Sequence, residues 1–140
     1  MLGFTLASSF AFAGGDAVAG QGKTAMCAGC HGADGNSAVA NFPKLAGQGE
    51  KYLTKQLQDI KSGSRSVVEM TGMLNTFSDQ DLADMSAYFA SKTIQMSGAK
   101  EENLERGERL FRGGNMETGV PACTGCHSPA GQGNAPAGYP

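Results

Sequence analysis

Two copies of one pentapeptide contain the residues of this chain that are best suited to chemistry. Both Cys27-Ala28-Gly29-Cys30-His31 and Cys123-Thr124-Gly125-Cys126-His127 have the form Cys-x-x-Cys-His, and together they use all four cysteines and both histidines. On a helical turn, the two thiols project from nearly one face and the histidine follows one step later. This is the attachment signature of c-type haem, in which two thioethers hold the macrocycle and an imidazole binds the iron. The sequence therefore predicts two haem c sites: Cys27, Cys30 and His31, and Cys123, Cys126 and His127.

Three other interpretations of Cys-x-x-Cys have less support. A thioredoxin-like redox pair needs a βαβ pattern, and the chain has no alternating strand pattern of useful length. A structural zinc site would crowd adjacent Cys and His ligands, and its usual spacings differ. Paired disulfides are a third alternative in an exported chain. The doubled motif, with the export signal described below, favours haem over all three.

The second axial ligand decides what a haem iron can do, because an open position binds small ligands and a filled one leaves electron transfer. Since both histidines are already used, a methionine thioether is expected; it favours ferrous iron and raises the potential. Met70 and Met73, in the loop between two predicted helices, are the candidates, and position alone does not separate them. The other methionines adjoin the first motif, lie in an apolar helical stripe, or fall in the linker or second domain: Met26, Met85, Met96 and Met116.

Short helices are expected to position these residues, and the predicted fold class is all-α. The pattern predicts helices over residues 16–27, 50–61 and 101–112 and a further helix that begins after Ser78, with Asp16 and Ser78 as N-caps. Gly20 and Gly22 weaken the first helix, which indicates either close approach of another helix or fraying. The carbonyl of Pro43, in a loop after the first motif, is the candidate partner for the ring of His31.

The composition fits a small domain organised around a cofactor. The chain has 140 residues, 40% hydrophobic and 7% aromatic residues, no Trp and 21 glycines, so a core of side chains alone would be thin. The net charge of −2 argues against a nucleic-acid partner. A basic stretch and an acidic stretch are interpreted as solvated helix faces rather than docking patches: Lys51, Lys55, Lys61 and Arg65, and Asp79, Asp81 and Asp84.

The chain divides into a leader and two repeated domains. Residues 1–13 are apolar and uncharged and end in Ala11-Phe12-Ala13, which indicates part of a signal peptide and a soluble, exported product. A Gly-Asn pair and an aromatic-Pro pair follow both motifs, as in residues 35–43 and 133–140. We expect a first domain over residues 14–90, a linker over 91–100, and the start of a second domain over 101–140. This second domain is expected to be truncated, with an incomplete haem site.

These motifs and their surroundings resemble the cytochromes c4, a family of exported dihaem proteins. The resemblance lies in residues 27–37, 41–48, 69–72, 78–84 and 120–129. It implies tandem cytochrome c-like domains, each with a few helices around a covalent haem. It also implies that His31 and Met70 are the axial ligands of the first haem and that His127 is the proximal ligand of the second. Pro43 matches the proline whose carbonyl holds the proximal histidine, and the second distal ligand is expected beyond Pro140.

The resemblance further implies a periplasmic electron carrier of a respiratory chain rather than an enzyme. The expected donor is a quinol–cytochrome c reductase or a dehydrogenase, and the expected acceptor is a terminal cytochrome oxidase. Loose association with the membrane surface is also expected. The alternative is a cytochrome subunit that accepts electrons from a partner dehydrogenase. A peroxidase is a weaker alternative, because it needs an open iron.

Overall fold

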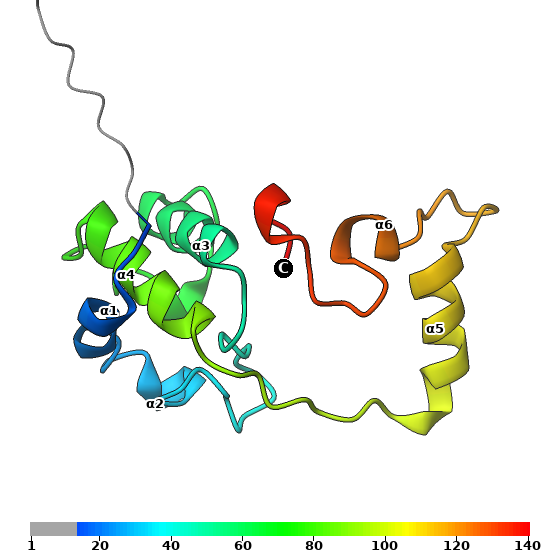
Figure 1. Ribbon diagram of the computed structural model, residues 1–140, viewed down its shortest axis with the longest axis horizontal. Helices are drawn as coiled ribbons and strands as arrows, with labels where there is room; N and C mark the ends of the chain where they lie inside the picture. Colours follow the sequence, from blue (N-terminus) through cyan, green and yellow to red (C-terminus); the bar gives the residue numbers. More distant parts are fainter. Residues whose placement is uncertain (1–13) are drawn as a thin grey trace, which may run out of the picture.

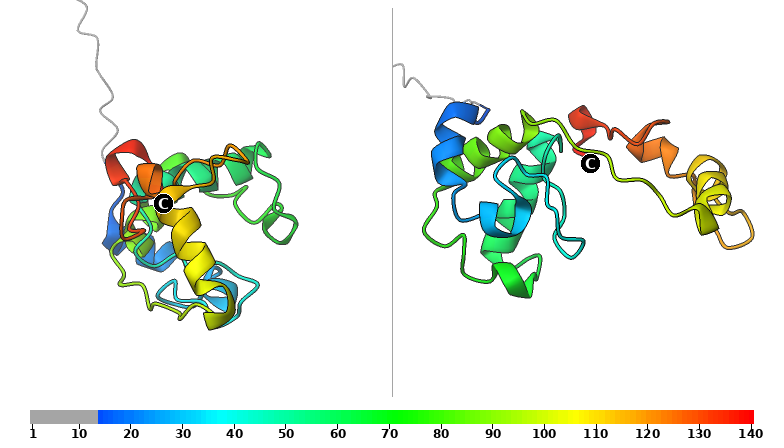
Figure 2. Two further views of the ribbon diagram at one scale, coloured as in Figure 1. Left: turned by 90° about the vertical axis from the view of Figure 1, so that its right-hand side faces the viewer. Right: turned by 90° about the horizontal axis from the view of Figure 1, so that it is seen from below.

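A computed structural model of the chain describes residues 14–140, so the signal peptide predicted for residues 1–13 lies outside the described residues. The chain forms two helical parts, and an extended connection over residues 93–100 joins them (Figures 1 and 2). The N-terminal part, residues 14–90, contains α1 (Ala17–Lys23), α2 (Ala28–His31), α3 (Glu50–Ser62), η1 (Val68–Met70) and α4 (Asp79–Ala90). The C-terminal part, residues 101–140, contains η2 (Glu101–Asn103), α5 (Leu104–Gly113), α6 (Thr124–His127) and η3 (Ala135–Ala137).

The predicted all-α fold is confirmed. Between residues 14 and 140 no strand is formed, and β-type pairing is limited to two isolated bridges, Asn115–Val120 and Asn134–Tyr139. None of the helices in this range combines the length and the apolar character needed to cross a bilayer.

Helix α1 packs closely against α4, and a glycine makes this approach feasible. Asp16 caps α1, since its carboxylate accepts backbone N–H groups of the first turn at 2.8 and 3.2 Å. A Cβ on Gly20 would lie 2.0 Å from the carbonyl oxygen of Asp84, whereas one on Gly22 would meet nothing within 4 Å. Close helix approach therefore explains Gly20 but not Gly22.

A buried carboxylate also joins α1 to α4. The side chain of Asp84 is 5% exposed, and it accepts hydrogen bonds from Lys23 Nζ at 2.6 Å, Gln80 Nε2 at 2.9 Å and the Asp16 N–H at 2.9 Å. Lys23 also pairs with Asp81 at 2.6 Å. The hydrogen-bonded Lys23 ammonium holds the pKa of both carboxyl groups below the ordinary range. Because all these polar groups find partners, the helices can bury them together.

The ends of α3 and α4 follow from local sequence. Gly63, in the left-handed conformation at φ +81°, ends α3. Ser78 and Asp81 form a reciprocal capping box at the start of α4, with the Ser78 N–H donating to the Asp81 carboxylate at 2.8 Å. The box forms with Asp in the position where Glu or Gln is more usual.

The predicted boundaries need two corrections. One helix over residues 16–27 is wrong, because α1 ends at Lys23 and a turn separates it from α2. The Thr24 hydroxyl donates to the Gln21 carbonyl at 3.0 Å, and the Cys27 N–H donates to the Thr24 carbonyl at 2.9 Å, so the chain turns here. The fourth helix begins with the 3₁₀ turn η2, and its α-helical section starts at Leu104 rather than Glu101.

Side chains from α3 and α4 make the core of the N-terminal part. Two clusters both contact Cys27, and they comprise Leu53, Tyr88 and Phe89, and Leu74, Leu82 and Met85. Leu82 and Met85 are fully buried, and such burial stabilises by about 1.5–3 kcal/mol per side chain. In contrast, residues 101–140 contribute no buried residue. The core therefore lies beside the first motif.

Candidate functional site

The first motif forms α2, and Cys27 stands at its N-terminal end. The His31 N–H donates to the Cys27 carbonyl at 2.9 Å, which completes one helical turn between the first thiol and the imidazole. Gly32 then turns the chain away from the helix at φ +80°, and a Cβ there would lie 2.9 Å from the Asn36 carbonyl oxygen. The residue after the histidine therefore needs to be glycine here.

The imidazole of His31 is buried and held by a backbone carbonyl. Its exposed fraction is 8%, and its Nδ1 lies 2.9 Å from the carbonyl oxygen of Pro43. Because a carbonyl only accepts, Nδ1 carries the proton and Nε2 keeps its lone pair for a metal ion. The ring of Phe42 packs edge-on against the imidazole at 6.1 Å between centroids.

A cavity of about 310 Å³ opens beside α2. Cys27, Cys30 and His31 line it, and so do Met70 and Met73 from the segment around η1. The rest of its lining is largely apolar, with side chains from the loop after the motif and from α3 and α4, including Leu45, Leu53, Leu57, Ile60, Leu74 and Phe89. Thiols, an imidazole, methionine thioethers and an apolar wall thus meet at one place, which suits a large apolar cofactor.

The methionines divide by their place relative to this cavity. Met70 ends η1, and the Met73 N–H donates to its carbonyl at 3.1 Å, so one short turn brings both thioethers to the cavity. Met85 also lines the cavity, but it is 1% exposed and belongs to the core of α4. Met26 lines it next to Cys27. The two remaining described methionines, Met96 and Met116, are 82% and 94% exposed and lie outside the lining.

Polar groups at the cavity edge are already engaged with one another. The guanidinium of Arg65 donates to the Gln56 side chain, and the ammonium of Lys44 donates to the Gln95 carbonyl. Both Arg65 and Lys44 line the cavity. Sequence reasoning had no signal for these contacts, because they join residues from different elements. Burial raises the pKa of the Cys27 thiol above its ordinary value.

Internal partners also account for the basic stretch on and after α3. Lys55 pairs with Asp59, Lys61 donates to the Phe77 carbonyl at 2.7 Å, and Lys51 donates to the Pro136 carbonyl at 3.0 Å. These contacts favour a structural role over a docking patch for the stretch.

The second motif repeats the geometry of the first. Cys123 stands at the start of α6, and the His127 N–H donates to its carbonyl at 2.9 Å. Nδ1 of His127 lies 2.8 Å from the carbonyl oxygen of Pro140, and the ring of Tyr139 lies 6.1 Å away between centroids. Here Pro140 and Tyr139 take the places that Pro43 and Phe42 hold at the first motif.

Ser128 breaks this similarity. It follows the second histidine, as Gly32 follows the first. Among the non-glycine residues of 14–140, Ser128 is the one with a positive φ, at φ +66° and ψ 161°. This region of backbone conformation is essentially restricted to glycine. Its hydroxyl oxygen is also buried with no hydrogen-bond partner among the described residues. Aligning the two motifs, His-Gly against His-Ser, would have identified the position from sequence.

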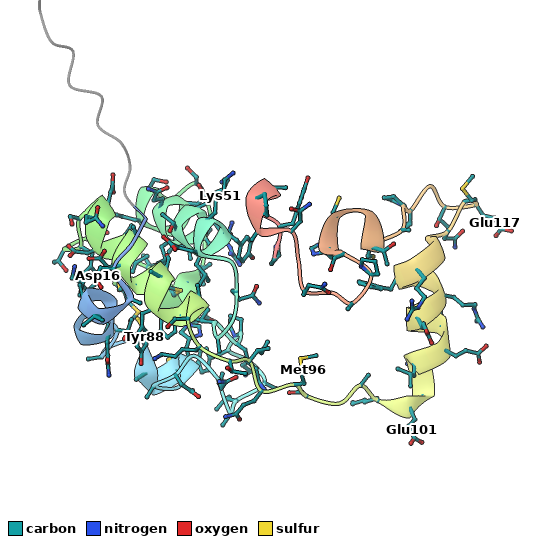
Figure 3. The ribbon with its side chains drawn as sticks, in the orientation of Figure 1. Asp16, Lys51, Tyr88, Met96, Glu101 and Glu117 are labelled. Atoms are coloured by element: carbon teal, nitrogen blue, oxygen red, sulfur yellow. The ribbon has the colours of Figure 1, made fainter. Side chains whose placement is uncertain are left out.

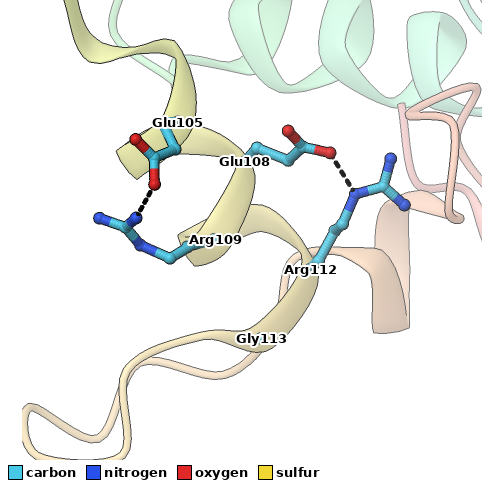
Figure 4. Close-up of a pocket in the computed structure, with 5 residues that line it drawn as sticks. All are labelled: Glu105, Glu108, Arg109, Arg112 and Gly113. Atoms are coloured by element: carbon cyan, nitrogen blue, oxygen red, sulfur yellow. Dashed lines mark hydrogen bonds and ion pairs between the residues drawn. The ribbon is translucent and has the colours of Figure 1, made fainter.

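A second depression lies on α5 and has a different character. Glu105 pairs with Arg109 at 2.5 Å, and Glu108 pairs with Arg112 at 2.9 Å, each one helical turn apart, beside Gly113 (Figure 4). These exposed pairs support the helix and bring no reactive group together.

The alternatives to haem attachment gain no support from the arrangement. All four cysteines are free thiols. Within residues 14–140, no group of three or more His, Cys, Asp or Glu side chains is arranged to hold a metal ion, so a structural zinc site lacks its ligand set there.

Comparison with known proteins adds three findings. Residues 17–93 match the cytochrome c family model. The chain is 59% identical to cytochrome c4 of Azotobacter vinelandii over 95% of its own length and 68% of the relative. It is 34% identical to the thiosulfate dehydrogenase electron acceptor of Thiomonas intermedia (strain K12), over 92% of the chain and 61% of the relative. The chain thus spans about two thirds of the length of these curated relatives.

A solved structure is also similar to this chain and is likewise a cytochrome c4. The crystal structure of reduced recombinant cytochrome c4 from Pseudomonas stutzeri matches with a TM-score of 0.88 and 58% sequence identity. The match covers 90% of this chain and 71% of the solved chain. The likeness therefore includes both helical parts.

Proposed function

We propose that this chain, which belongs to the cytochrome c family and within it to the cytochromes c4, carries two covalent haems. We propose further that it passes single electrons between redox partners. Covalent haem c and electron transfer follow from the family, whose members of this type are electron carriers rather than enzymes. The number of haems and the roles of individual residues are our proposal. Bound haem supplies a one-electron couple between ferric and ferrous iron.

The residues around the first motif fit this cofactor. We assign Cys27 and Cys30 to the two thioether bonds and His31 to the proximal position. The Pro43 carbonyl, 2.9 Å from Nδ1, orients the ring and keeps its proton away from the metal side. The apolar lining excludes water and disfavours the more highly charged ferric state, which raises the potential.

The observation that carries the function is that the imidazole of His31 and the thioethers of Met70 and Met73 line one cavity. A thioether in the distal position fills the coordination sphere, and a filled sphere supports electron transfer rather than binding of oxygen species. Of the two methionines, we assign Met70 as the distal ligand on the resemblance of residues 69–72 to the family. The cavity by itself accommodates either assignment.

At the second motif we assign Cys123 and Cys126 to attachment and His127 to the proximal position. The carbonyl of Pro140 holds the His127 ring as Pro43 holds that of His31. Because none of residues 101–140 is buried, this site is the more open of the two within the described chain. We therefore propose a tandem of cytochrome c-like units over residues 14–90 and 101–140, with residues 91–100 as the linker.

We further propose that the chain works in the periplasm, in a respiratory chain. The apolar leader ending in Ala11-Phe12-Ala13 supports export, and export suits covalent haem attachment. A quinol–cytochrome c reductase or a dehydrogenase would supply electrons, and a terminal cytochrome oxidase would accept them.

One relative favours a second candidate function. The similar protein of Thiomonas intermedia is named as an electron acceptor of thiosulfate dehydrogenase. A dehydrogenase is therefore an alternative partner, with this chain as its acceptor subunit. Copurification of a stoichiometric dehydrogenase from the native source would support this candidate over a freely diffusing carrier.

The proposal is tested on exported protein that has matured with the haem attachment machinery. We expect intact mass to show two haem adducts per chain and reduction to give the absorbance bands of haem held by two thioethers. Replacing both cysteines of one motif by alanine is expected to remove one adduct. Protein that carries no tetrapyrrole under these conditions would refute the function.

A further inference from the structure

We propose that Lys51, in the first turn of α3, is a positioning residue for His127, and that it acts through η3. The inference rests on the proposed function, since it takes the second motif to hold haem. It assigns to the N-terminal part a role in tuning the haem of the C-terminal part.

The two parts of the molecule meet where η3 lies against the start of α3 (Figures 1 and 3). The ammonium of Lys51 donates to the Pro136 carbonyl at 3.0 Å. The methylenes of Lys51 pass beside Gly138, because a Cβ built there would lie 3.7 Å from the Lys51 Cδ. A Cβ on Gly49 would lie 4.0 Å from Ala135, so the backbone of η3 approaches the helix start.

A closed loop connects this contact to the histidine. Asn134 and Tyr139 exchange two backbone hydrogen bonds of 3.1 Å, and the Asn134 side chain accepts the Ala137 N–H at 3.3 Å. These hydrogen bonds hold the loop both where its two ends meet, at Asn134 and Tyr139, and within its turn, at Ala137. Pro140 directly follows the base, and its carbonyl oxygen lies 2.8 Å from Nδ1 of His127. A displacement of η3 would therefore also displace the Pro140 carbonyl and change the hydrogen bond that orients the His127 ring.

The loop of the first site is held differently. The carbonyl of Gly35 accepts the N–H groups of Leu45 and Ala46 at 2.7 and 3.1 Å, and the Gly47 N–H donates to the Phe89 carbonyl at 3.0 Å. These contacts lie within the N-terminal part and fix the segment that follows Pro43. The loop that carries Pro43 is therefore held within the N-terminal part and by the linker, where Lys44 donates to the Gln95 carbonyl, whereas the loop that carries Pro140 contacts α3.

The chemistry predicts a selective effect. A hydrogen bond to the outer nitrogen of a ligating histidine fixes the ring and raises its basicity, which tunes the iron. Loosening η3 from Lys51 would weaken that hydrogen bond at His127 only. The reduction potential and the proton spectrum of the second haem would change, and those of the first would not.

The test uses the full chain with both haems attached, which intact mass verifies first. Lys51→Met keeps the methylenes beside Gly138 and removes the ammonium. Lys55→Met, one turn further along α3, is the matched control, because it removes the same charge from a residue that pairs with Asp59. Lys51→Arg retains a donor for the carbonyl. The measurements are potentiometric titration and the hyperfine-shifted NMR resonances of each haem.

We expect Lys51→Met to shift the second-haem resonances and potential, Lys55→Met to shift neither, and Lys51→Arg to restore most of the original values. Unchanged second-haem signals in Lys51→Met would overturn the inference and leave the two-haem function intact. Equal shifts at both haems, reproduced by Lys55→Met, would show a general charge effect and would also overturn it. Protein without an adduct at the second motif would instead refute the proposed second site.

Discussion

The two motif regions share their local geometry and differ in what surrounds it. In both, the histidine ring is held by a proline carbonyl, at 2.9 Å for His31 and 2.8 Å for His127, with an aromatic ring 6.1 Å away. The first faces a cavity lined by α3, η1 and α4, and among the described residues 101–140 none is buried. The hydrogen bond to each histidine is thus specified by a local pattern of residues, whereas the cavity at the first motif and the contact of Lys51 with the loop of the second depend on packing between distant segments.

The residue after the histidine sharpens the contrast. Gly32 and Ser128 adopt nearly the same backbone angles, at φ +80° and +66° with ψ 151° and 161°. Glycine adopts this conformation without steric cost, whereas serine does so with strain of about 1–3 kcal/mol. The second site therefore reaches the same geometry from a less favourable residue.

Replacing the assigned distal ligand gives the largest expected effect and tests the independence of the two sites. Met70→Ala is expected to open the first iron and lower its potential by an appreciable fraction of the roughly 0.8 V that axial ligands span. Met73→Ala, the matched control on the same turn, is expected to retain the original spectrum. Redox titration with absorbance spectra of both variants measures the effect. If Met73→Ala rather than Met70→Ala lost thioether ligation, our assignment would be wrong.

Replacing a helical glycine by alanine is expected to have opposite effects on stability in the two parts. Gly20→Ala would place a Cβ 2.0 Å from the Asp84 carbonyl oxygen, and such overpacking destabilises by about 1–3 kcal/mol or more. Gly107, in α5, has nothing within 4 Å of its built Cβ, so Gly107→Ala is expected to stabilise that helix by about 0.5–1 kcal/mol. Urea unfolding of the two variants gives the comparison. Equal tolerance of alanine at both positions would contradict the packing of α1 on α4.

Acid is expected to weaken the N-terminal part first. Lys23 lowers the pKa of Asp81 and Asp84 in the folded chain, so their stabilisation is present above the ordinary Asp pKa of 3.8. It is lost as the pH falls through the lower pKa values of the folded state. Urea midpoints between pH 7 and pH 2 are expected to fall over this range, and less steeply in Lys23→Met. A parallel fall in both proteins would show that other carboxyl groups dominate acid unfolding.

The smallest effect is expected from exchanging the residues that follow the histidines. Ser128→Gly removes the strain and the buried hydroxyl without a partner, and it is expected to stabilise the chain by about 1 kcal/mol. The reverse change, Gly32→Ser, introduces a Cβ 2.9 Å from the Asn36 carbonyl oxygen and is expected to destabilise by a similar amount or more. Unfolding curves for both variants test the pair. Destabilisation by Ser128→Gly would show that the serine hydroxyl has a role we have not assigned.

Several elements were predictable because their causes lie within a few residues. Asp16 and Ser78 cap helices as expected, since each acts on the adjacent turn. The end of α1 was predicted wrongly, because the Thr24 hydroxyl bonds the Gln21 carbonyl and terminates the helix before the motif. Helical periodicity alone does not register such a competing side-chain contact.

The sequence by itself determined the cofactor class, the two attachment motifs and the repeated aromatic-Pro loops, because each depends on residue types at short, fixed spacings. Tertiary structure decided that Gly20 meets Asp84, that the Met70 segment and α2 share one cavity, and that Lys51 contacts Pro136. These contacts join residues far apart in the chain, and periodicity does not specify which faces meet.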